Sequence, residues 1–209
     1  MNVTSSSVSP VERALRHTVV EIEKSAASLG WDRASTVYAL VPTISLLELD
    51  ELPDDMRSHL RKQWDGTSDA LTAVIQEDLP GIDLEDTLAQ LGWPDSVAGA
   101  AVCTERVMVP TDVQAAAPDD PVEAVEFFAN HPERDDVRIV AGVMRTGEIW
   151  CAVRTRSHDH DDEVAQGDSL VPGLTDALLT TFAPAEERIS YDGDGSCGNC
   201  GCGSNGCGQ

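Results

Sequence analysis

The stretch that decides the fold lies at residues 137–156 and reads VRIVAGVMRTGEIWCAVRTR. Two runs rich in β-branched and apolar residues flank a Thr-Gly turn, which is typical of a tight β-hairpin. Apolar side chains occur on both faces: Val137, Ile139, Ala141 and Val143 on one, and Val140, Met144 and Trp150 on the other. A strand that is apolar on both faces is usually central in a sheet or covered on both sides. We therefore predict that this hairpin forms the centre of the sheet.

The remaining elements follow from hydrophobic periodicity. Residues 35–41, 71–77 and 97–109 have the composition of strands. Helical spacing marks residues 10–29, 55–64, a short segment after Asp83, the segment after Asp120, and 172–182. About five strands with no regular βαβ alternation predict a single α+β domain, with a mixed or mainly antiparallel sheet and helices mainly on one face.

Two helices begin with the same capping signal, Ser9-Pro10-Val11-Glu12 and Asp120-Pro121-Val122-Glu123. In the first helix, which ends at Gly30, the apolar stripe predicts that Glu21 and Glu23 lie on the solvated face. In the second, we expect Val122, Val125, Phe128 and Ala129 to point inward. Residues 111–119 between strand and helix are predicted to form a loop.

The chain divides into three parts by composition. Residues 1–9 are predicted to be disordered, residues 10–183 to form the α+β domain, and residues 184–209 to form a flexible tail rich in glycine and cysteine. From residue 192 onward the tail has no apolar residues whose burial could offset its ordering entropy. We expect it to be ordered only when something is bound to it.

The charge of the chain excludes two classes of partner. The formal net charge is −23, and lysine occurs only at Lys24 and Lys62. Such a surface repels both nucleic-acid phosphates and anionic lipid. With no apolar run of about 18 residues and no signal peptide in the sequence, we expect a cytoplasmic protein that binds a protein partner, neither nucleic acid nor membrane.

The tail holds four cysteines, Cys197, Cys200, Cys202 and Cys207, spaced C-x2-C-x-C-x4-C. Four thiolates complete a tetrahedral shell for Zn²⁺, and soft sulfur also suits Cu(I). The sequence therefore suggests a soft metal site on the tail, although it is not the paired C-x2-C spacing of zinc fingers. An unliganded flexible tail, thiol–disulfide chemistry, and a thiazole- or oxazole-modified peptide precursor remain alternatives.

Two weaker candidate sites lie in the domain. His158, Asp159, His160 and Asp161 offer imidazoles and carboxylates to a divalent cation, or form a solvated loop. Arg138, Arg154 and Arg156 are expected to share one face of the hairpin. There they would present a fork to a carboxylate or phosphate, or pair with nearby acids such as Asp159 or Glu148.

The sequence contains no nucleophile elbow, P-loop, dinucleotide-binding glycine motif or zinc-protease motif. Cys103 and Cys151 lie in apolar strands and are interpreted as buried hydrophobic residues. Trp93 is interpreted as a packing anchor. A non-enzymatic protein is therefore favoured over an enzyme.

Four motifs carry a resemblance: WPDSVAGAA at 93–101, HPERDDVRIVAGV at 131–143, RTRSHD at 154–159 and LVPGL at 170–174. Through them the chain resembles a family of small uncharacterised actinobacterial proteins, over about residues 10–182. The resemblance implies cytosolic expression and no established activity. Of the candidate histidine ligands it includes only His158 and not His160, and the cysteine tail lies outside it.

Three functional hypotheses follow. The first is a binding or accessory protein whose tail binds a soft metal ion. The second is a protein-interaction module, such as a chaperone-like adaptor, with an inert tail. The third is an enzyme with a pocket near His158 and Arg154.

Overall fold

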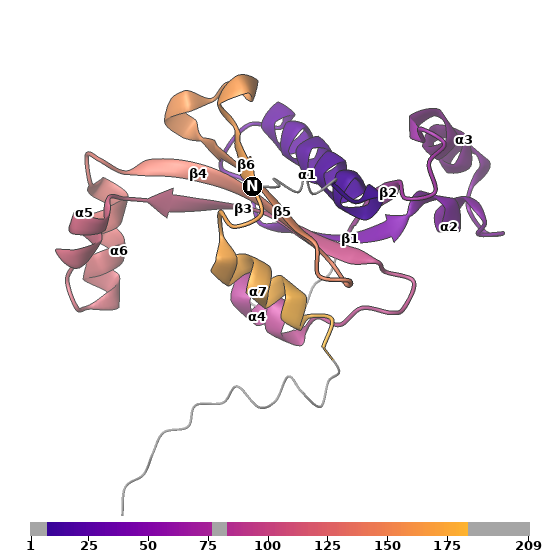
Figure 1. The fold of residues 1–209 in the computed structure, drawn as a ribbon. Helices are drawn as coiled ribbons and strands as arrows, with labels where there is room; N and C mark the ends of the chain where they lie inside the picture. Colours follow the sequence, from indigo (N-terminus) through magenta and orange to yellow (C-terminus); the bar gives the residue numbers. More distant parts are fainter. Residues whose placement is uncertain (1–7, 77–82, 184–209) are drawn as a thin grey trace, which may run out of the picture.

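The computed structural model describes residues 8–76 and 83–183. Six antiparallel strands form one open sheet in the order β2-β1-β3-β4-β5-β6 (Figure 1). The strands are β1 Thr36–Pro42, β2 Leu71–Ile75, β3 Gly99–Met108, β4 Asp135–Met144, β5 Ile149–Thr155 and β6 Ala165–Gly167. The α+β prediction is confirmed, and the sheet is entirely antiparallel. It has one strand more than expected because the short β6 pairs with β5.

The predicted hairpin is confirmed as β4 and β5. Four residues, 145–148, connect the strands. Among them Gly147 adopts a φ of +102°, the left-handed region that glycine enters at little cost. The amide of Gly147 donates to the carbonyl of Met144 at 2.9 Å and closes the turn. The two faces of β4 are covered by different helices, which explains why its sequence is apolar on both.

Helix α1, Pro10–Ser28, covers one face of the sheet (Figure 1). Its Leu15, Val19 and Ile22 are buried against residues of β1, β3, β4 and β5. Gly142 on β4 permits this close approach, because a Cβ there would lie 2.6 Å from Val19 Cγ2. The N-terminal cap is as predicted, since the amide of Glu12 donates to Ser9 Oγ at 3.0 Å.

The opposite face carries α4, Leu84–Gln90, and α7, Pro172–Thr180. Leu84, Leu88 and Leu178 are buried there against Val102 and Val143. The expectation that helices lie mainly on one face is therefore wrong: helices cover both faces, α1 on one and α4 with α7 on the other. Their apolar stripes show that each helix has a buried side, but not which face of the sheet it covers.

Trp93 packs on this second core and its ring lies 6.2 Å from that of Phe182. Its indole N–H donates to Thr181 Oγ1 at 2.8 Å. Cys103 and Cys151 are free and buried. The packing roles predicted for these three residues are confirmed.

Two pairs of helices lie at opposite ends of the sheet (Figure 1). Helices α2, Thr43–Leu47, and α3, Asp54–Gln63, lie at the β1–β2 end. Helices α5, Thr111–Ala115, and α6, Pro121–Asn130, lie at the far end of β3 and β4. The predicted loop at 111–119 thus contains a short helix. Two short 3-10 turns, η1 Arg156–His158 and η2 Asp161–Glu163, connect β5 to β6.

Helix α6 contradicts the predicted burial of its apolar side chains. It has no buried residue, and Val122 and Val125 are 70% and 67% exposed. Phe127 and Phe128 are half-buried and lie edge to face at 5.5 Å. The helix forms where predicted, but its valines face solvent.

Within residues 8–76 and 83–183, no helix has the length and apolar character needed to cross a bilayer.

Candidate functional site

The three arginines predicted to share a face are brought together on the α1 side of the hairpin. Arg138 and Arg154 are opposite one another in the β4–β5 register, and Arg156 follows two residues later. Arg138 and Arg154 are almost completely buried. Each of the three guanidinium groups is paired with carboxylates of the chain itself.

Arg154 forms the most buried ion pair. Its Nε and Nη2 donate to the two carboxylate oxygens of Glu23 at 2.6 and 2.9 Å. Asp159 and Asp161 accept further bonds at 3.1 and 2.7 Å. The hydrogen bonds with Glu23, followed by those with the two aspartates, raise the pKa of Arg154 above its usual value. The guanidinium therefore stays charged.

Glu23 is 2% exposed, so its predicted place on the solvated face of α1 is wrong. Sequence spacing alone cannot show that an arginine on a distant strand lies opposite this helical position. Because a buried carboxylate without a partner is costly, the pair fixes the C-terminal half of α1 over β5.

Trp31, in the loop after α1, covers the cluster. Arg138 lies 4.3 Å from its ring centre, a cation–π contact. The indole N–H donates to Asp159 Oδ2 at 2.8 Å. This bond, and after it the bonds from Arg154, hold the pKa of Asp159 below its ordinary value of 3.8.

The other two arginines also bind acids. Arg138 Nη2 donates to Glu105 at 3.0 Å and to the carbonyl of Gly30 at 2.5 Å. Arg156 donates to both oxygens of Asp32 at 3.0 Å and to Asp136 at 3.1 Å. Internal pairing, the alternative drawn from sequence, thus accounts for the charges in this cluster. Binding of an external anion by Arg138, Arg154 and Arg156 stays a prediction.

The histidine-aspartate segment lies in η1 and η2. Asp159 and Asp161 are bound to Arg154, while the ring Nδ1 of His158 lies 2.8 Å from Ser157 Oγ. In the described part of the chain, no three His, Cys, Asp or Glu side chains converge as they would around a metal ion. The metal candidates Cys197, Cys200, Cys202 and Cys207 lie outside the described residues.

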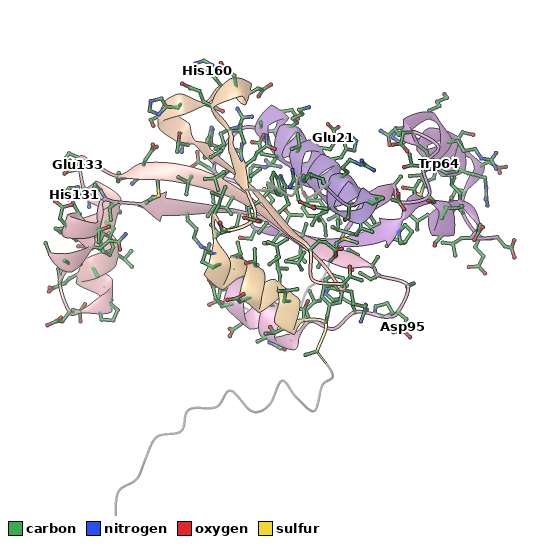
Figure 2. All side chains as sticks on the ribbon, viewed as in Figure 1. Glu21, Trp64, Asp95, His131, Glu133 and His160 are labelled. Atoms are coloured by element: carbon green, nitrogen blue, oxygen red, sulfur yellow. The ribbon has the colours of Figure 1, made fainter. Side chains whose placement is uncertain are left out.

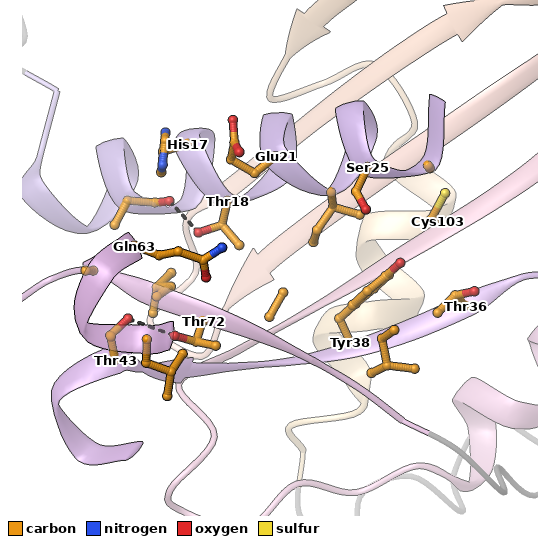
Figure 3. Close-up of a pocket in the computed structure, with 18 of the residues that line it drawn as sticks. His17, Thr18, Glu21, Ser25, Thr36, Tyr38, Thr43, Gln63, Thr72 and Cys103 are labelled. Carbon is orange, nitrogen blue, oxygen red and sulfur yellow. Dashed lines mark hydrogen bonds between the residues drawn. The ribbon is translucent and has the colours of Figure 1, made fainter. Parts of the chain in front are cut away.

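A larger feature was not predicted: an open groove of about 1350 Å³ on the α1 face of the sheet. One flank of α1 forms a wall, β1 and β2 form the floor, and α3 contributes Gln63 (Figure 3). Trp64, directly after α3, also lines the groove. Along α1 the lining residues recur at helical spacing: Pro10, Arg13, Ala14, His17, Thr18, Glu21, Ile22, Ser25, Ala26 and Leu29. The groove therefore follows the whole helix.

The groove has an apolar floor and polar walls. Leu71, Ala73 and Ile75 of β2 supply apolar surface. Figure 3 shows His17, Glu21 and Ser25 spaced along α1 above the strands. In the wider view of Figure 2, Glu21 lies on α1 and Trp64 at the end of α3. These groups can donate and accept hydrogen bonds along the length of the groove.

Two groups in the groove are poorly suited to nucleophilic chemistry. Burial raises the pKa of the Cys103 thiol to about 11, so it is protonated at neutral pH. Burial likewise raises the pKa of Tyr38. An activated nucleophile requires a shift in the opposite direction.

The charge balance of the groove is acidic. Its lining includes five carboxylates, Glu21, Asp32, Asp65, Asp69 and Glu105, and three guanidinium groups, Arg13, Arg33 and Arg138. The amide and hydroxyl of Thr67 hold the pKa of Asp65 below its usual value, so this carboxylate is ionised at neutral pH. A ligand with basic groups is favoured over an acidic one.

The groove could hardly be predicted from the sequence. His17, Glu21 and Ser25 recur every four residues, and such a polar stripe has the same pattern as a solvated helix face. The neighbouring wall comes from Leu60, Gln63 and Trp64, more than thirty residues after the end of α1.

Comparison with protein families confirms the resemblance seen in the sequence. The profile of the PPA1309-like protein family matches residues 15–183. The chain belongs to the PPA1309-like family. The match spans both helical layers and the whole sheet, while the cysteine tail lies outside it. The description of the PPA1309-like family names no activity, and the curated proteins and the solved structures gave no match.

Proposed function

We propose that this PPA1309-like protein is a cytoplasmic binding protein whose groove accepts an extended, mainly apolar segment of a partner polypeptide. The observation that carries the proposal is the 1350 Å³ groove that runs along α1. The buried free thiols of Cys103 and Cys151 fit a reducing compartment.

The dimensions of the groove favour a peptide over a compact small molecule. The lining of α1 runs from Pro10 to Leu29, which at 1.5 Å per residue is about 28 Å. Ligand pockets for drug-sized molecules commonly hold about 300–1000 Å³, less than this groove. Dividing volume by length gives a cross-section of about 50 Å², close to that of one extended strand. About eight or nine extended residues span this length.

The chemistry of the groove predicts the composition of the segment. Apolar side chains at alternate positions would contact Leu71, Ala73 and Ile75, and the polar groups of α1 would bind its main chain. The excess of carboxylates favours lysine or arginine among the remaining positions. The raised pKa values of Cys103 and Tyr38 support binding over catalysis.

The test is selection of nine-residue peptides from a displayed random library on the full-length protein. We expect the selected peptides to alternate apolar and polar residues and to carry net positive charge. Ser25→Trp places an indole in the groove and should weaken their binding at least tenfold. Ser28→Trp is the matched control, because Ser28 is exposed on the same helix but does not line the groove.

Equal binding of the selected peptides to wild type and Ser25→Trp would overturn the proposal. A library that yields no binders would also overturn it if the apolar dye 1-anilinonaphthalene-8-sulfonate binds to wild type but not to Ser25→Trp. That second outcome would assign the groove to a small apolar molecule.

The tail supports a second candidate function, which rests on its sequence. Four cysteines within eleven residues, at 197, 200, 202 and 207, provide enough thiolates for one Zn²⁺ or Cu(I) ion. We infer that the tail binds a soft metal independently of the groove.

Elemental mass spectrometry of protein purified under reducing conditions tests this second function. About one equivalent of zinc or copper is expected with the full chain, and none after deletion of residues 192–209. A full-length variant with all four tail cysteines changed to serine controls for the deletion. Equal metal content in the three proteins would exclude the tail as the site.

A further inference from the structure

A second surface, distinct from the groove, lies on α6 at the far end of the sheet. Val122, Val125 and Ala129 are all exposed and follow one another at spacings of three and four residues. Residues at this spacing form a single stripe along a helix. Ala124, Phe127 and Phe128 on the other side are partly buried, so α6 is oriented with its valines outward.

The stripe has an acidic rim. Glu123 and Glu126 on the same helix are exposed, as are Asp119 and Asp120 before it and Glu133 after it. Figure 2 shows Glu133 and His131 together at the end of this helix pair. Arg134, the first arginine after α6 in the sequence, is bound to Asp136 at 2.8 Å and to the carbonyl of Ala129. Apolar side chains within a rim of carboxylates complement an apolar segment with basic flanks.

We propose that α6 is a docking surface for a basic amphipathic helix of a partner protein. A helix with apolar residues three and four positions apart packs its ridge along the valine stripe. Lysine or arginine residues beside that ridge pair with Glu123 and Glu126. Neighbouring apolar residues exposed on a soluble protein commonly mark an interaction site.

The negative charge around the stripe favours a basic partner helix over two other occupants. An anionic membrane is repelled by the same carboxylates that attract basic side chains. A second copy of the chain would place two acidic rims against each other on proteins of net charge −23. A basic partner helix meets neither obstacle.

The experiment measures binding of two designed 18-residue amphipathic peptides to the full-length protein by fluorescence anisotropy at 150 mM NaCl. One peptide contains leucine and lysine, and the other has glutamate in place of every lysine. We expect the Leu/Lys peptide to bind and the Leu/Glu peptide not to bind. Val122→Ser with Val125→Ser should lower the affinity for the Leu/Lys peptide at least tenfold. Glu123→Gln with Glu126→Gln should lower it about threefold.

The matched control is Leu49→Ser with Met56→Ser, because these side chains are 52% and 53% exposed. Leu49 connects α2 to α3 and Met56 belongs to α3, and these helices lie at the opposite end of the sheet from α6. The control should bind the Leu/Lys peptide like wild type, as should Ser25→Trp, which occupies the groove. Unchanged affinity of the double serine variant of α6 would overturn the proposal, as would loss of binding in Ser25→Trp. A wild-type dimer in sedimentation velocity that dissociates on Val122→Ser/Val125→Ser would assign the stripe to a second copy instead.

Discussion

Helices α1 and α6 begin with the same capping sequence, but α1 is packed against the sheet and α6 is exposed. Each has a capping residue followed by Pro-Val-Glu, and both caps form. Ser9 accepts from the amide of Glu12 at 3.0 Å, and Asp120 accepts from those of Val122 and Glu123 at 2.9 and 3.1 Å. Yet α1 buries Leu15, Val19 and Ile22, whereas α6 buries none of its residues.

The difference arises from what lies beneath each helix. α1 crosses the middle of the sheet, where Gly142 allows close approach and the partly buried hairpin offers apolar surface. α6 lies beyond the covered part of β3, whose last three residues, Arg106, Val107 and Met108, are themselves exposed. A capping box thus fixes where a helix begins, while burial depends on where the topology places it.

The largest expected effect comes from breaking the buried charge that holds α1. Arg154→Met leaves Glu23 without the guanidinium that binds both its oxygens, and removal of one partner of a buried pair costs about 3–5 kcal/mol. We expect a loss of this size in the free energy of unfolding, measured by urea titration.

Two further variants sharpen this result. Arg156→Met is the control, since its solvent-screened pairs with Asp32 and Asp136 should contribute little to the free energy of unfolding. Adding Glu23→Leu to Arg154→Met removes the orphaned carboxylate and should restore most of the stability. A double variant no more stable than Arg154→Met would show that the pair itself is not the cause.

The second effect compares apolar side chains on the two helices. Leu15→Ala empties fully buried space and should lower the free energy of unfolding by about 2–5 kcal/mol. Val125→Ala, at an exposed position of α6, should change it by less than about 0.5 kcal/mol. Thermal unfolding followed by circular dichroism measures both, and a comparable loss in the two variants would mean that α6 is packed in solution.

The third effect tests why α1 fits the sheet. Gly142→Ala places a methyl group 2.6 Å from Val19 Cγ2 in a packed core, which should cost about 1–3 kcal/mol. Gly173→Ala is the matched control, since nothing lies within 4 Å of a Cβ there. It should be neutral or slightly stabilising. A neutral Gly142→Ala would indicate that α1 is free to shift on β4.

The smallest effect depends on pH. The pKa of Asp159 is lowered in the folded state, so its contribution to stability is present above the unfolded value of 3.8 and lost as pH falls below it. Asp159→Asn should therefore reduce stability at pH 7 by about 0.5 kcal/mol, discounted because the side chain is nearly half exposed. The variant and wild type should converge in urea titrations near pH 2; a constant difference would contradict the linkage.

The sequence by itself determined the local elements of this protein. The hairpin at 137–156 was predictable because its β-branched runs flank a glycine that a tight turn requires. Helix starts at Pro10 and Pro121 were predictable because capping depends on residues three positions apart. The burial of Cys103 and Cys151 and the packing role of Trp93 also followed from their neighbours in the chain.

Only the tertiary structure decided how these elements are combined. It placed Glu23 opposite Arg154, 131 residues away, and so turned a residue predicted to be solvated into a buried ion pair. It set α3 across from α1 to form the groove, and left the valines of α6 facing solvent. The physical reason is the same in each case. Periodicity shows that a helix has two sides, but what each side contacts depends on residues distant in sequence.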